Sequence, residues 1–235
     1  MYIDAHCHIG ENMQELNKTS VKFALVNSAT EDDWQKIIKL SKLNIGFVGA
    51  IGFHPWYIKG LKKGWQNRLK ELLIENPELS VGEIGLDKYK PDIDRQEQVF
   101  IEQLNIACEL QRTVSLHCVG AWDKVLQVFK SFQKRLPKYI ICHSFNGSLD
   151  ILNKLVKNYG AYISYSPMVI KSESDKVKNL IKETPKDKLL IESDSSDTSL
   201  CLQVADFIAT IRPEEDIKNQ IYKNGLLVIR NGQIA

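Results

Sequence analysis

The chain has 235 residues, of which 43% are hydrophobic and 26% are charged, and its formal net charge is +2. This length is close to the ~250 residues typical of one closed α/β barrel, and the composition is ordinary for a globular protein. A charge so near balance argues against a strongly basic nucleic-acid-binding protein, although it leaves room for an anionic substrate.

No targeting or membrane-spanning segment is recognisable in the sequence. Met1 is followed at once by Tyr2, Ile3 and Asp4, without the basic region and apolar core of a signal peptide. No apolar run approaches the ~18 residues needed to cross a bilayer. The five cysteines are odd in number and show no CxxC spacing, which argues against a disulfide framework or a thiolate zinc site. We therefore expect a cytoplasmic protein with free thiols, no membrane association and no obligate protein partner.

Short β-branched runs alternate with longer amphipathic stretches along the whole chain. The eight predicted strands are Tyr2–Ile9, Lys22–Ala29, Ile45–Phe53, Ser80–Leu86, Thr113–Val119, Tyr139–Phe145, Ala161–Ser166 and Leu189–Asp194. The predicted helices are Glu31–Leu43, Leu61–Glu75, Asp94–Leu110, Ala121–Arg135, Leu149–Tyr159, Ser172–Glu183, Leu200–Ile211 and Pro213–Val228, the last with Pro213 in its first turn. The stretch Gly10–Ser20 is too short and polar to predict a helix.

Eight strand–helix units predict an α/β protein, a single (β/α)8 TIM barrel domain over residues 1–235, although a doubly wound open sheet alternates in the same way. The polar residues separate the two architectures. All five histidines and two acidic residues lie at or just beyond the C-terminal half of a predicted strand: His6, His8, His54, Glu83, His117, His143 and Asp194. The C-terminal rim of a barrel brings residues from separate strands to one central site, which favours the barrel.

The alternation of side chains along a strand adds a second observation. His6 and His8 are two residues apart, so they share one face, which we expect to be the barrel interior. Cys7 then points to the helix layer, and Cys118 and Cys142 do the same beside their histidines. These cysteines are interpreted as small buried residues rather than as ligands.

Imidazole and carboxylate groups from separate strands predict a site for one or two divalent ions, with zinc, magnesium and manganese all compatible. Glu83 is the natural carboxylate to bridge two ions. Asp194 can bind metal and also accept the proton of an attacking water, so Asp194 and Glu83 are the candidate catalytic residues.

Structural interpretations of the same residues remain open. A lone His-x-His pair at a strand end also serves to satisfy core hydrogen bonds, and Glu83 can cap the following helix. Asp194 lies in a polar cluster typical of a loop before a helix. His54 precedes Pro55, and we expect it to shape a turn or support a ligand rather than bind metal directly. The joint pattern favours a metal site, because clustered buried histidines without metal are costly.

A set of motifs stands in order along the chain: Asp4-Ala-His-Cys-His8, Gly52-Phe-His-Pro55, Gly82-Glu-Ile-Gly-Leu-Asp87, the helix from Gln96 to Ala107, His117, His143-Ser-Phe-Asn-Gly-Ser148, Leu190-Ile-Glu-Ser-Asp194 and Asn224. Together they resemble the TatD family of metal-dependent deoxyribonucleases in the amidohydrolase superfamily. The resemblance implies that His6, His8, Glu83 and Asp194 hold one metal ion and that Glu83, His117 and His143 hold a second. It places His54 and Asp87 behind the ligands or against the substrate, and it implies cleavage of DNA phosphodiesters.

The chain departs from the family pattern where the substrate phosphate is expected. Val119 stands in place of an arginine two residues after the fifth-strand histidine, and Ser195 and Ser196 replace an Ala-Pro pair after Asp194. The arginine-containing loop that normally follows is also missing. Because arginine is the preferred bidentate partner of phosphate, hydrolysis is better supported than DNA as the substrate.

Three functions follow from these observations. The first is a metal-dependent phosphodiesterase acting on DNA or a smaller phosphoester, for which Trp56, Tyr57 and Trp65 offer base stacking and nearby basic residues, namely Lys59, Lys62, Lys63, Arg68 and Lys70, offer phosphate contacts. An alternative interpretation of that basic stretch is a solvated helix face. The second function is a superfamily esterase, lactonase or amidase acting on a small substrate. The third is a degenerate member without catalysis, against which the complete ligand set argues.

Overall fold

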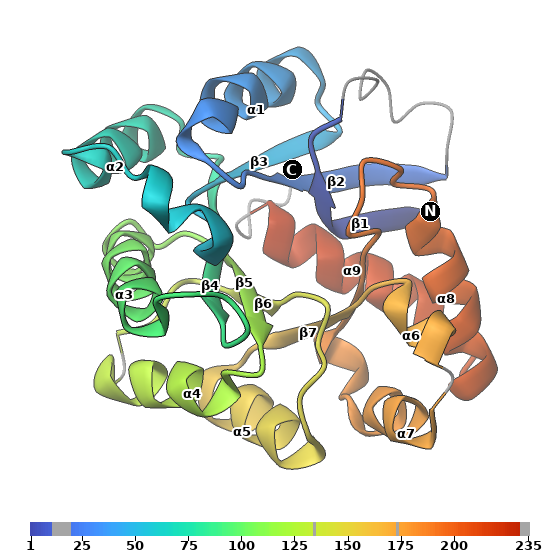
Figure 1. Cartoon of the computed structure of the whole chain (residues 1–235). Helices are drawn as coiled ribbons and strands as arrows, with labels where there is room; N and C mark the ends of the chain where they lie inside the picture. Colours follow the sequence, from blue (N-terminus) through green and yellow to red (C-terminus); the bar gives the residue numbers. More distant parts are fainter. Residues whose placement is uncertain (11–19, 134, 173, 231–235) are drawn as a thin grey trace.

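In a computed structural model of the chain, which describes residues 1–10, 20–133, 135–172 and 174–230, eight parallel strands form one sheet in the order β1 to β8. The strands are β1 Tyr2–His8, β2 Val21–Asn27, β3 Phe47–Ile51, β4 Ser80–Asp87, β5 Val114–Val119, β6 Ile140–Cys142, β7 Tyr162–Tyr165 and β8 Leu189–Ile191. Helices surround the strands (Figure 1), which confirms the predicted TIM barrel.

The α-helices are α1 Glu31–Leu43, α2 Trp65–Glu75, α3 Ile93–Glu109, α4 Trp122–Ser131, α5 Leu149–Tyr159, α6 Met168–Ser172, α7 Asp175–Glu183, α8 Leu200–Ile211 and α9 Ile217–Ile229, and two 3-10 turns are η2 Pro55–Gly60 and η3 Lys186–Lys188. Local signals set some of these ends. At the start of α1 the Thr30 N–H donates to the Asp33 carboxylate at 3.0 Å, and α5 ends at Gly160 with a left-handed φ of 64°.

Four predicted helices are corrected at their ends. The helix predicted over Ala121–Arg135 is α4, which ends at Ser131. The helix expected from Leu61 begins at Trp65, because the chain after Pro55 first forms η2. The helix predicted over Ser172–Glu183 begins at Asp175, after the N-cap Ser174, and a separate short helix, α6, ends at Ser172. Pro213 lies outside the last helix, since Arg212 ends α8 and α9 begins only after Asp216.

The barrel closes through backbone hydrogen bonds between β1 and the chain just beyond β8. The Asp194 N–H donates to the His6 carbonyl at 3.0 Å, and the His8 N–H donates to the Ser195 carbonyl at 3.1 Å. The chain just beyond β8 therefore runs beside β1 and carries Asp194 to the two N-terminal histidines.

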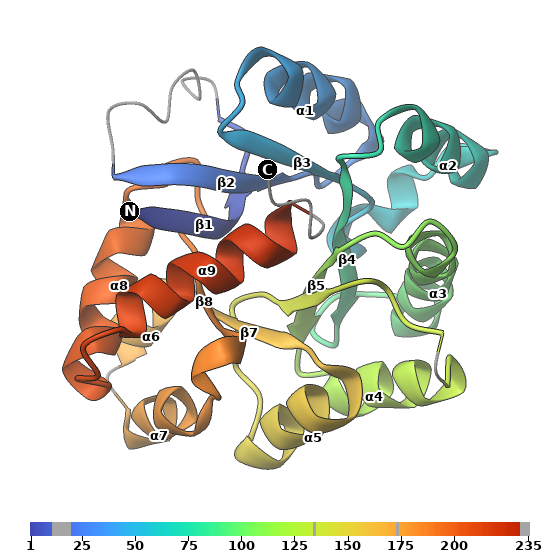
Figure 2. The same cartoon turned by 180° about the vertical axis from the view of Figure 1, so that it is seen from behind.

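Helix α9 crosses one end of the barrel (Figure 2). Its Val228 and Ile229 belong to the same buried cluster as Ile3 and Leu25 on the first two strands. Asn224 of α9 is buried and donates to the Leu189 carbonyl at 2.9 Å, which ties the helix to β8. This end of the barrel is therefore filled by packing, and it is the opposite end of the strands that carries the polar residues.

Two predictions reach beyond the residues that the structure describes. The stretch Gly10–Ser20, for which no helix is predicted, lies almost wholly in residues 11–19, outside the described part. The prediction of one domain over residues 1–235 also stays a prediction. Among the described helices, none has both the length and the apolar character needed to cross a bilayer.

Candidate metal centre

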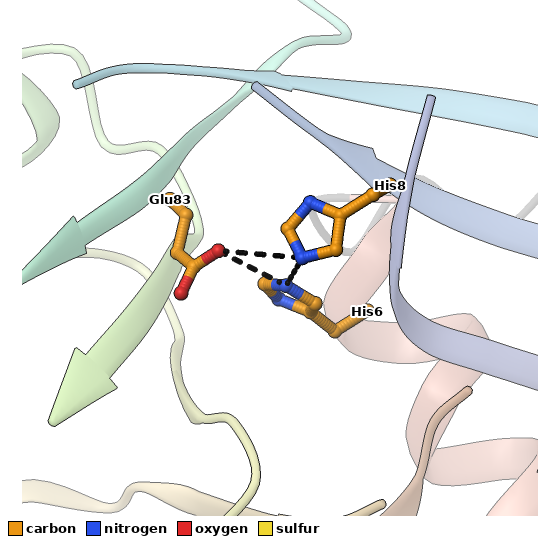
Figure 3. Close-up of side chains that lie close together, drawn as sticks. All are labelled: His6, His8 and Glu83. Atoms are coloured by element: carbon orange, nitrogen blue, oxygen red, sulfur yellow. Dashed lines mark hydrogen bonds and ion pairs between the residues drawn. The ribbon is translucent and has the colours of Figure 1, made fainter. Parts of the chain in front are cut away.

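The predicted site residues meet at the C-terminal end of the barrel strands. The contributions are His6 and His8 from β1, His54 after β3, Glu83 from β4, His117 from β5, His143 after β6 and Asp194 after β8. Except for the fully buried His6, these side chains line one cavity of about 720 Å³. Figure 3 shows Glu83 pointing across the barrel toward His6 and His8.

A bulge in each of two strands, β1 and β4, directs side chains toward the site. The β1–β2 register advances by three residues on β1, from Asp4 to Cys7, but by only two on β2. An equivalent shift between Val81 and Ile84 surrounds Glu83 on β4. An extra residue reverses the face on which the following side chains lie, so each bulge re-aims a strand next to the site. Asp4 shows the consequence, because it accepts from the Ser193 N–H at 2.9 Å rather than joining the cluster.

Gly85 allows β4 and β5 to approach closely beside the site. Its φ is +146°, and a Cβ atom there would lie 1.9 Å from the His117 carbonyl oxygen. Any side chain at this position would push apart the strands that carry Glu83 and His117, so the second glycine of the Gly-Glu-Ile-Gly motif is required by geometry.

Glu83 is the central residue of the cluster, and its two oxygens face different histidines. Oε1 lies 2.7 Å from His117 Nδ1, 2.9 Å from His143 Nε2 and 3.2 Å from His54 Nε2. Oε2 lies 3.3 Å from His6 Nε2 and 3.7 Å from His8 Nε2. Burial alone would raise the pKa of Glu83, but the surrounding imidazoles, His143 foremost, hold that pKa well below its usual range. Glu83 is therefore an ionised carboxylate with 1% of its surface exposed.

His8 and Asp194 form the solvent-facing side of the cluster. His8 Nε2 lies 3.3 Å from Asp194 Oδ1, and about a third of each side chain is exposed. Burial opposes ionisation of Asp194, but the hydrogen bond from His8 and the positive fields of His143 and His6 together outweigh it and lower the pKa of Asp194 to about 2. Asp194 also has a left-handed φ of 50°, a conformation uncommon for residues other than glycine. The fold thus holds an ionised, accessible carboxylate in a constrained position at the cavity.

Hydrogen bonds behind the rings orient several of the imidazoles. His6 Nδ1 lies 2.8 Å from Ser115 Oγ, and His143 Nδ1 lies 3.3 Å from Glu192 Oε1, so both rings turn Nε2 toward Glu83. When Nδ1 carries the hydrogen in these bonds, Nε2 is left with a lone pair for a metal ion.

His54 is oriented in the opposite sense. Its Nδ1 accepts a hydrogen bond from the Trp56 N–H at 3.1 Å, so in the neutral ring the hydrogen is on Nε2. Nε2 then donates to Glu83 Oε1 rather than offering a lone pair. His54 also caps η2 through the same Nδ1 contact, so this arrangement supports the expectation that His54 shapes a turn and orients Glu83 rather than binding metal.

Asp87 lies behind His117, on the side away from Glu83. Its Oδ2 is 3.8 Å from His117 Nε2 and accepts from Trp56 Nε1 at 2.6 Å. The structure thus places Asp87 beside a candidate ligand and against Trp56, which lines the cavity.

The donor set fits a divalent metal ion. Glu83 Oε2 and His117 Nε2 are buried and have no hydrogen-bond partner among the described residues, which is costly unless something else satisfies them. Donor atoms within 4.8 Å of one another occur in three groups: His6, His8 and Glu83; His6, His143 and Asp194; and His54, Glu83 and His117. Nitrogen and carboxylate donors suit zinc, manganese and magnesium alike. Which ligand belongs to which ion stays a prediction.

Two supporting residues carried no separate prediction from the sequence. Ser115 and Glu192 contact the rings of His6 and His143 from strands that are distant in sequence. Glu192 is fully buried and also accepts from the Ser144 N–H at 2.6 Å. A sequence signal existed for Glu192, because it directly follows an apolar run of leucine and isoleucine and lies two residues before Asp194.

The predicted basic stretch is not part of the cavity. Arg68 pairs with Glu31, Lys70 with Glu109, and Lys62 with Asp32 on the outer helices. The residues that line the cavity include no lysine or arginine within the described part of the chain. Those ion pairs favour the solvated-face interpretation. Trp56 and Tyr57 do line the cavity, whereas Trp65 is buried against Phe53 and cannot stack a base.

Comparisons with known proteins bear on the family and the fold of the chain. A family model described as TatD related DNase matches residues 3–225. The uncharacterized metal-dependent hydrolase YjjV of Escherichia coli is 26% identical over 212 residues, covering 85% of this chain and 81% of that protein. The crystal structure of YjjV, described as a TatD homologue, has the same fold with a TM-score of 0.88, 23% identity and 98% of both chains covered.

Two further relatives are named as nucleases. The human 3'-5' RNA nuclease TATDN2 is 24% identical over 220 residues, covering 83% of this chain but only 28% of that protein. The deoxyribonuclease Tat-D of Schizosaccharomyces pombe is 28% identical over 156 residues, covering 64% of this chain and 49% of that protein.

Proposed function

This chain belongs to the TatD-related DNase family and is a metal-dependent hydrolase, and on that premise we propose that it cleaves phosphodiester bonds of DNA. The observation that carries the proposal is the ionised, buried Glu83, whose two oxygens face separate groups of histidines. We propose His6, His8, Glu83, His117, His143 and Asp194 as the ligands of one or two divalent ions. Such an ion supplies Lewis-acid polarisation of the scissile group and acidifies an attacking water.

The residues of the chain then have separate tasks in hydrolysis. Asp194 is accessible from the cavity and ionised, so it accepts the proton as water attacks phosphorus and the P–O ester bond breaks. The departing alkoxide takes its proton from solvent. His8 holds the Asp194 carboxylate, and His54 and Ser115 orient Glu83 and His6.

The choice of DNA rests on the named activities of relatives. One is named a deoxyribonuclease and another an RNA nuclease, so RNA is the closest competing substrate. A second candidate function is hydrolysis of a small neutral ester, lactone or amide. It is favoured by Val119 and by the absence of lysine and arginine from the described cavity lining, because a neutral substrate requires no cationic partner.

Purified protein loaded with Mg²⁺, Mn²⁺ or Zn²⁺ should be incubated with labelled DNA, with RNA of the same sequence, and with a panel of lactones, amides and carboxylic esters. We expect DNA cleavage that falls by at least about 100-fold in Asp194→Asn. The folded variant, prepared identically, also controls for contaminating nuclease. Turnover confined to small esters would replace DNA with the second candidate, and absence of all turnover would refute both.

We further propose a cytoplasmic location. The support is that all five cysteines are unpaired and buried, which is usual for proteins of reducing compartments. Microscopy of the tagged full chain in its source cells tests this, and a signal outside the cytoplasm would contradict it.

A further inference from the structure

Two aromatic side chains stand exposed at the mouth of the cavity, and the metal chemistry does not use them. Trp56 and Tyr57 line the cavity and are 48% and 45% exposed. Both belong to η2, which begins directly after His54. A large exposed aromatic beside a site offers a flat apolar face that a ligand ring can cover.

Trp56 is held in place by three separate contacts. Its Nε1 donates to Asp87 Oδ2 at 2.6 Å, and its backbone N–H donates to His54 Nδ1 at 3.1 Å. The Lys90 ammonium lies 4.2 Å from the centroid of the indole ring, within the range of a cation–π contact. The ring is therefore oriented before any ligand arrives, which reduces the entropy lost on binding.

The loop that holds Trp56 is itself fixed from the core. Gln96 of α3 is buried, and its Oε1 accepts from the Asp87 N–H at 2.8 Å. Its Nε2 donates to the Asp87 and Pro91 carbonyls at 3.1 and 2.9 Å. One side chain thus fixes both ends of the segment from which Asp87 and Lys90 reach Trp56.

The position of Trp56 relates it directly to the metal site. Its ring centroid lies 5.0 Å from that of His54 and 6.2 Å from that of His117. A ring stacked on Trp56 therefore lies within about one nucleotide of the ligand cluster. Lys90 adds a cation beside this position, whereas the described cavity lining contains no lysine or arginine.

We propose, on the basis of the proposed phosphodiesterase function, that Trp56 is a specificity-determining residue that stacks the base of the nucleotide next to the scissile phosphate. The Lys90 ammonium lies beside this nucleotide and attracts its negatively charged phosphate. The ligand chemistry is a planar base attached to a phosphodiester, which either DNA or RNA supplies. Stacking tolerates every base, so Trp56 selects base-bearing over base-free phosphodiesters without reading sequence.

The test compares two short labelled oligonucleotides with the same backbone, oligothymidylate and its abasic analogue. Their affinities are measured by fluorescence anisotropy in the presence of a chelator, and kcat/KM is measured separately with metal. The wild-type protein should prefer oligothymidylate, and Trp56→Ala should lower its affinity and kcat/KM by about 5- to 100-fold. For the abasic oligomer, Trp56→Ala should change the affinity and kcat/KM by less than about threefold. Trp56→Phe should recover most of the preference because it keeps a ring.

Two control variants separate this role from general damage. Tyr89→Ala removes an exposed aromatic that does not line the cavity and should leave both oligomers unaffected. Lys90→Ala should weaken binding of both oligomers, because both carry phosphate, and that of oligothymidylate more, because Lys90 also contacts the Trp56 ring. The same comparison of a base-bearing and an abasic oligomer, made with ribonucleotides, identifies whether DNA or RNA supplies the base that stacks on Trp56.

The outcomes distinguish this proposal from the proposed function. Equal binding of the two oligomers by the wild type, or an equal loss of both in Trp56→Ala, overturns base stacking even if DNA is cleaved. A base preference that Trp56→Ala abolishes supports stacking even if no phosphodiester is cleaved, in which case only the proposed function fails.

Discussion

Glu83 Oε1 lies 2.7 Å from His117 Nδ1, although the two residues are 34 positions apart and belong to adjacent strands. The same oxygen lies 2.9 Å from His143 Nε2. An ionised buried carboxylate with several imidazole nitrogens around it compensates its charge with protons or with metal ions. Glu83 is therefore the residue on which metal binding should depend most.

Glu83→Gln should lose most of the bound metal, because an amide is a neutral and weak ligand in a site that relies on one central carboxylate. Metal content after dialysis is measured by elemental analysis, with circular dichroism to establish folding. Glu97→Gln, which alters an ion pair with Lys124 on the outer helices, is the matched control. Retention of wild-type stoichiometry in folded Glu83→Gln would contradict the central role of Glu83.

Removing the metal should lower the thermal stability of the protein, because an ion bound only to the folded state stabilises it by mass action. At free metal about 100-fold above Kd the stabilisation is about 2.7 kcal/mol, which for a chain of this size corresponds to a Tm shift of about 5–10 °C. Differential scanning calorimetry with chelator and with added Mn²⁺ measures the shift. Glu83→Gln should show almost none, and an equal shift in both proteins would mean that the ion binds elsewhere.

The positions of the site residues on their strands were predictable from the sequence. Histidines and acids near the C-terminal ends of parallel strands meet at one rim whatever the details of packing, so His6, His117 and Asp194 needed only the strand assignments. Helices with strong local signals, such as α1 after Thr30 and α5 before Gly160, were also predicted at their observed ends.

The contacts that aim these residues were not predictable, because they join segments distant in sequence. Side-chain alternation alone would place Asp4 on the face of His6, and only the β1–β2 pairing reveals the bulge that separates them. Ser115 meets His6 across 109 positions, and Glu192 meets His143 across 49. No local pattern encodes such partners.

Cys108 should make the stability of the protein fall at alkaline pH. Burial raises the pKa of the Cys108 thiol to about 11, above the ~8.5 of an exposed thiol. A raised folded-state pKa gives stability that is full below the unfolded pKa and is lost as pH rises through the folded pKa, because the unfolded thiol ionises first. Between about pH 8.5 and 11, Cys108→Ala should lose less unfolding free energy than the wild type, by about 1 kcal/mol after allowance for partial hydration. Unfolding free energies are measured by urea denaturation across this range. An equal fall with pH in Cys108→Ala and in the wild type would contradict the assignment.

Gln103 of α3 should be essential to the stability of the segment that carries His54. It is buried, and its side chain accepts from the Phe53 N–H at 2.7 Å and donates to the Phe53 carbonyl at 3.1 Å. Gln103→Leu leaves both backbone groups without these partners, which should cost about 2–4 kcal/mol. Gln98→Leu, on the exposed face of the same helix, should change stability by less than about 0.5 kcal/mol. Because Phe53 precedes His54, Gln103→Leu should also lower kcat/KM for the substrate identified, and a stable variant with unchanged kcat/KM would show that this amide does not position the site.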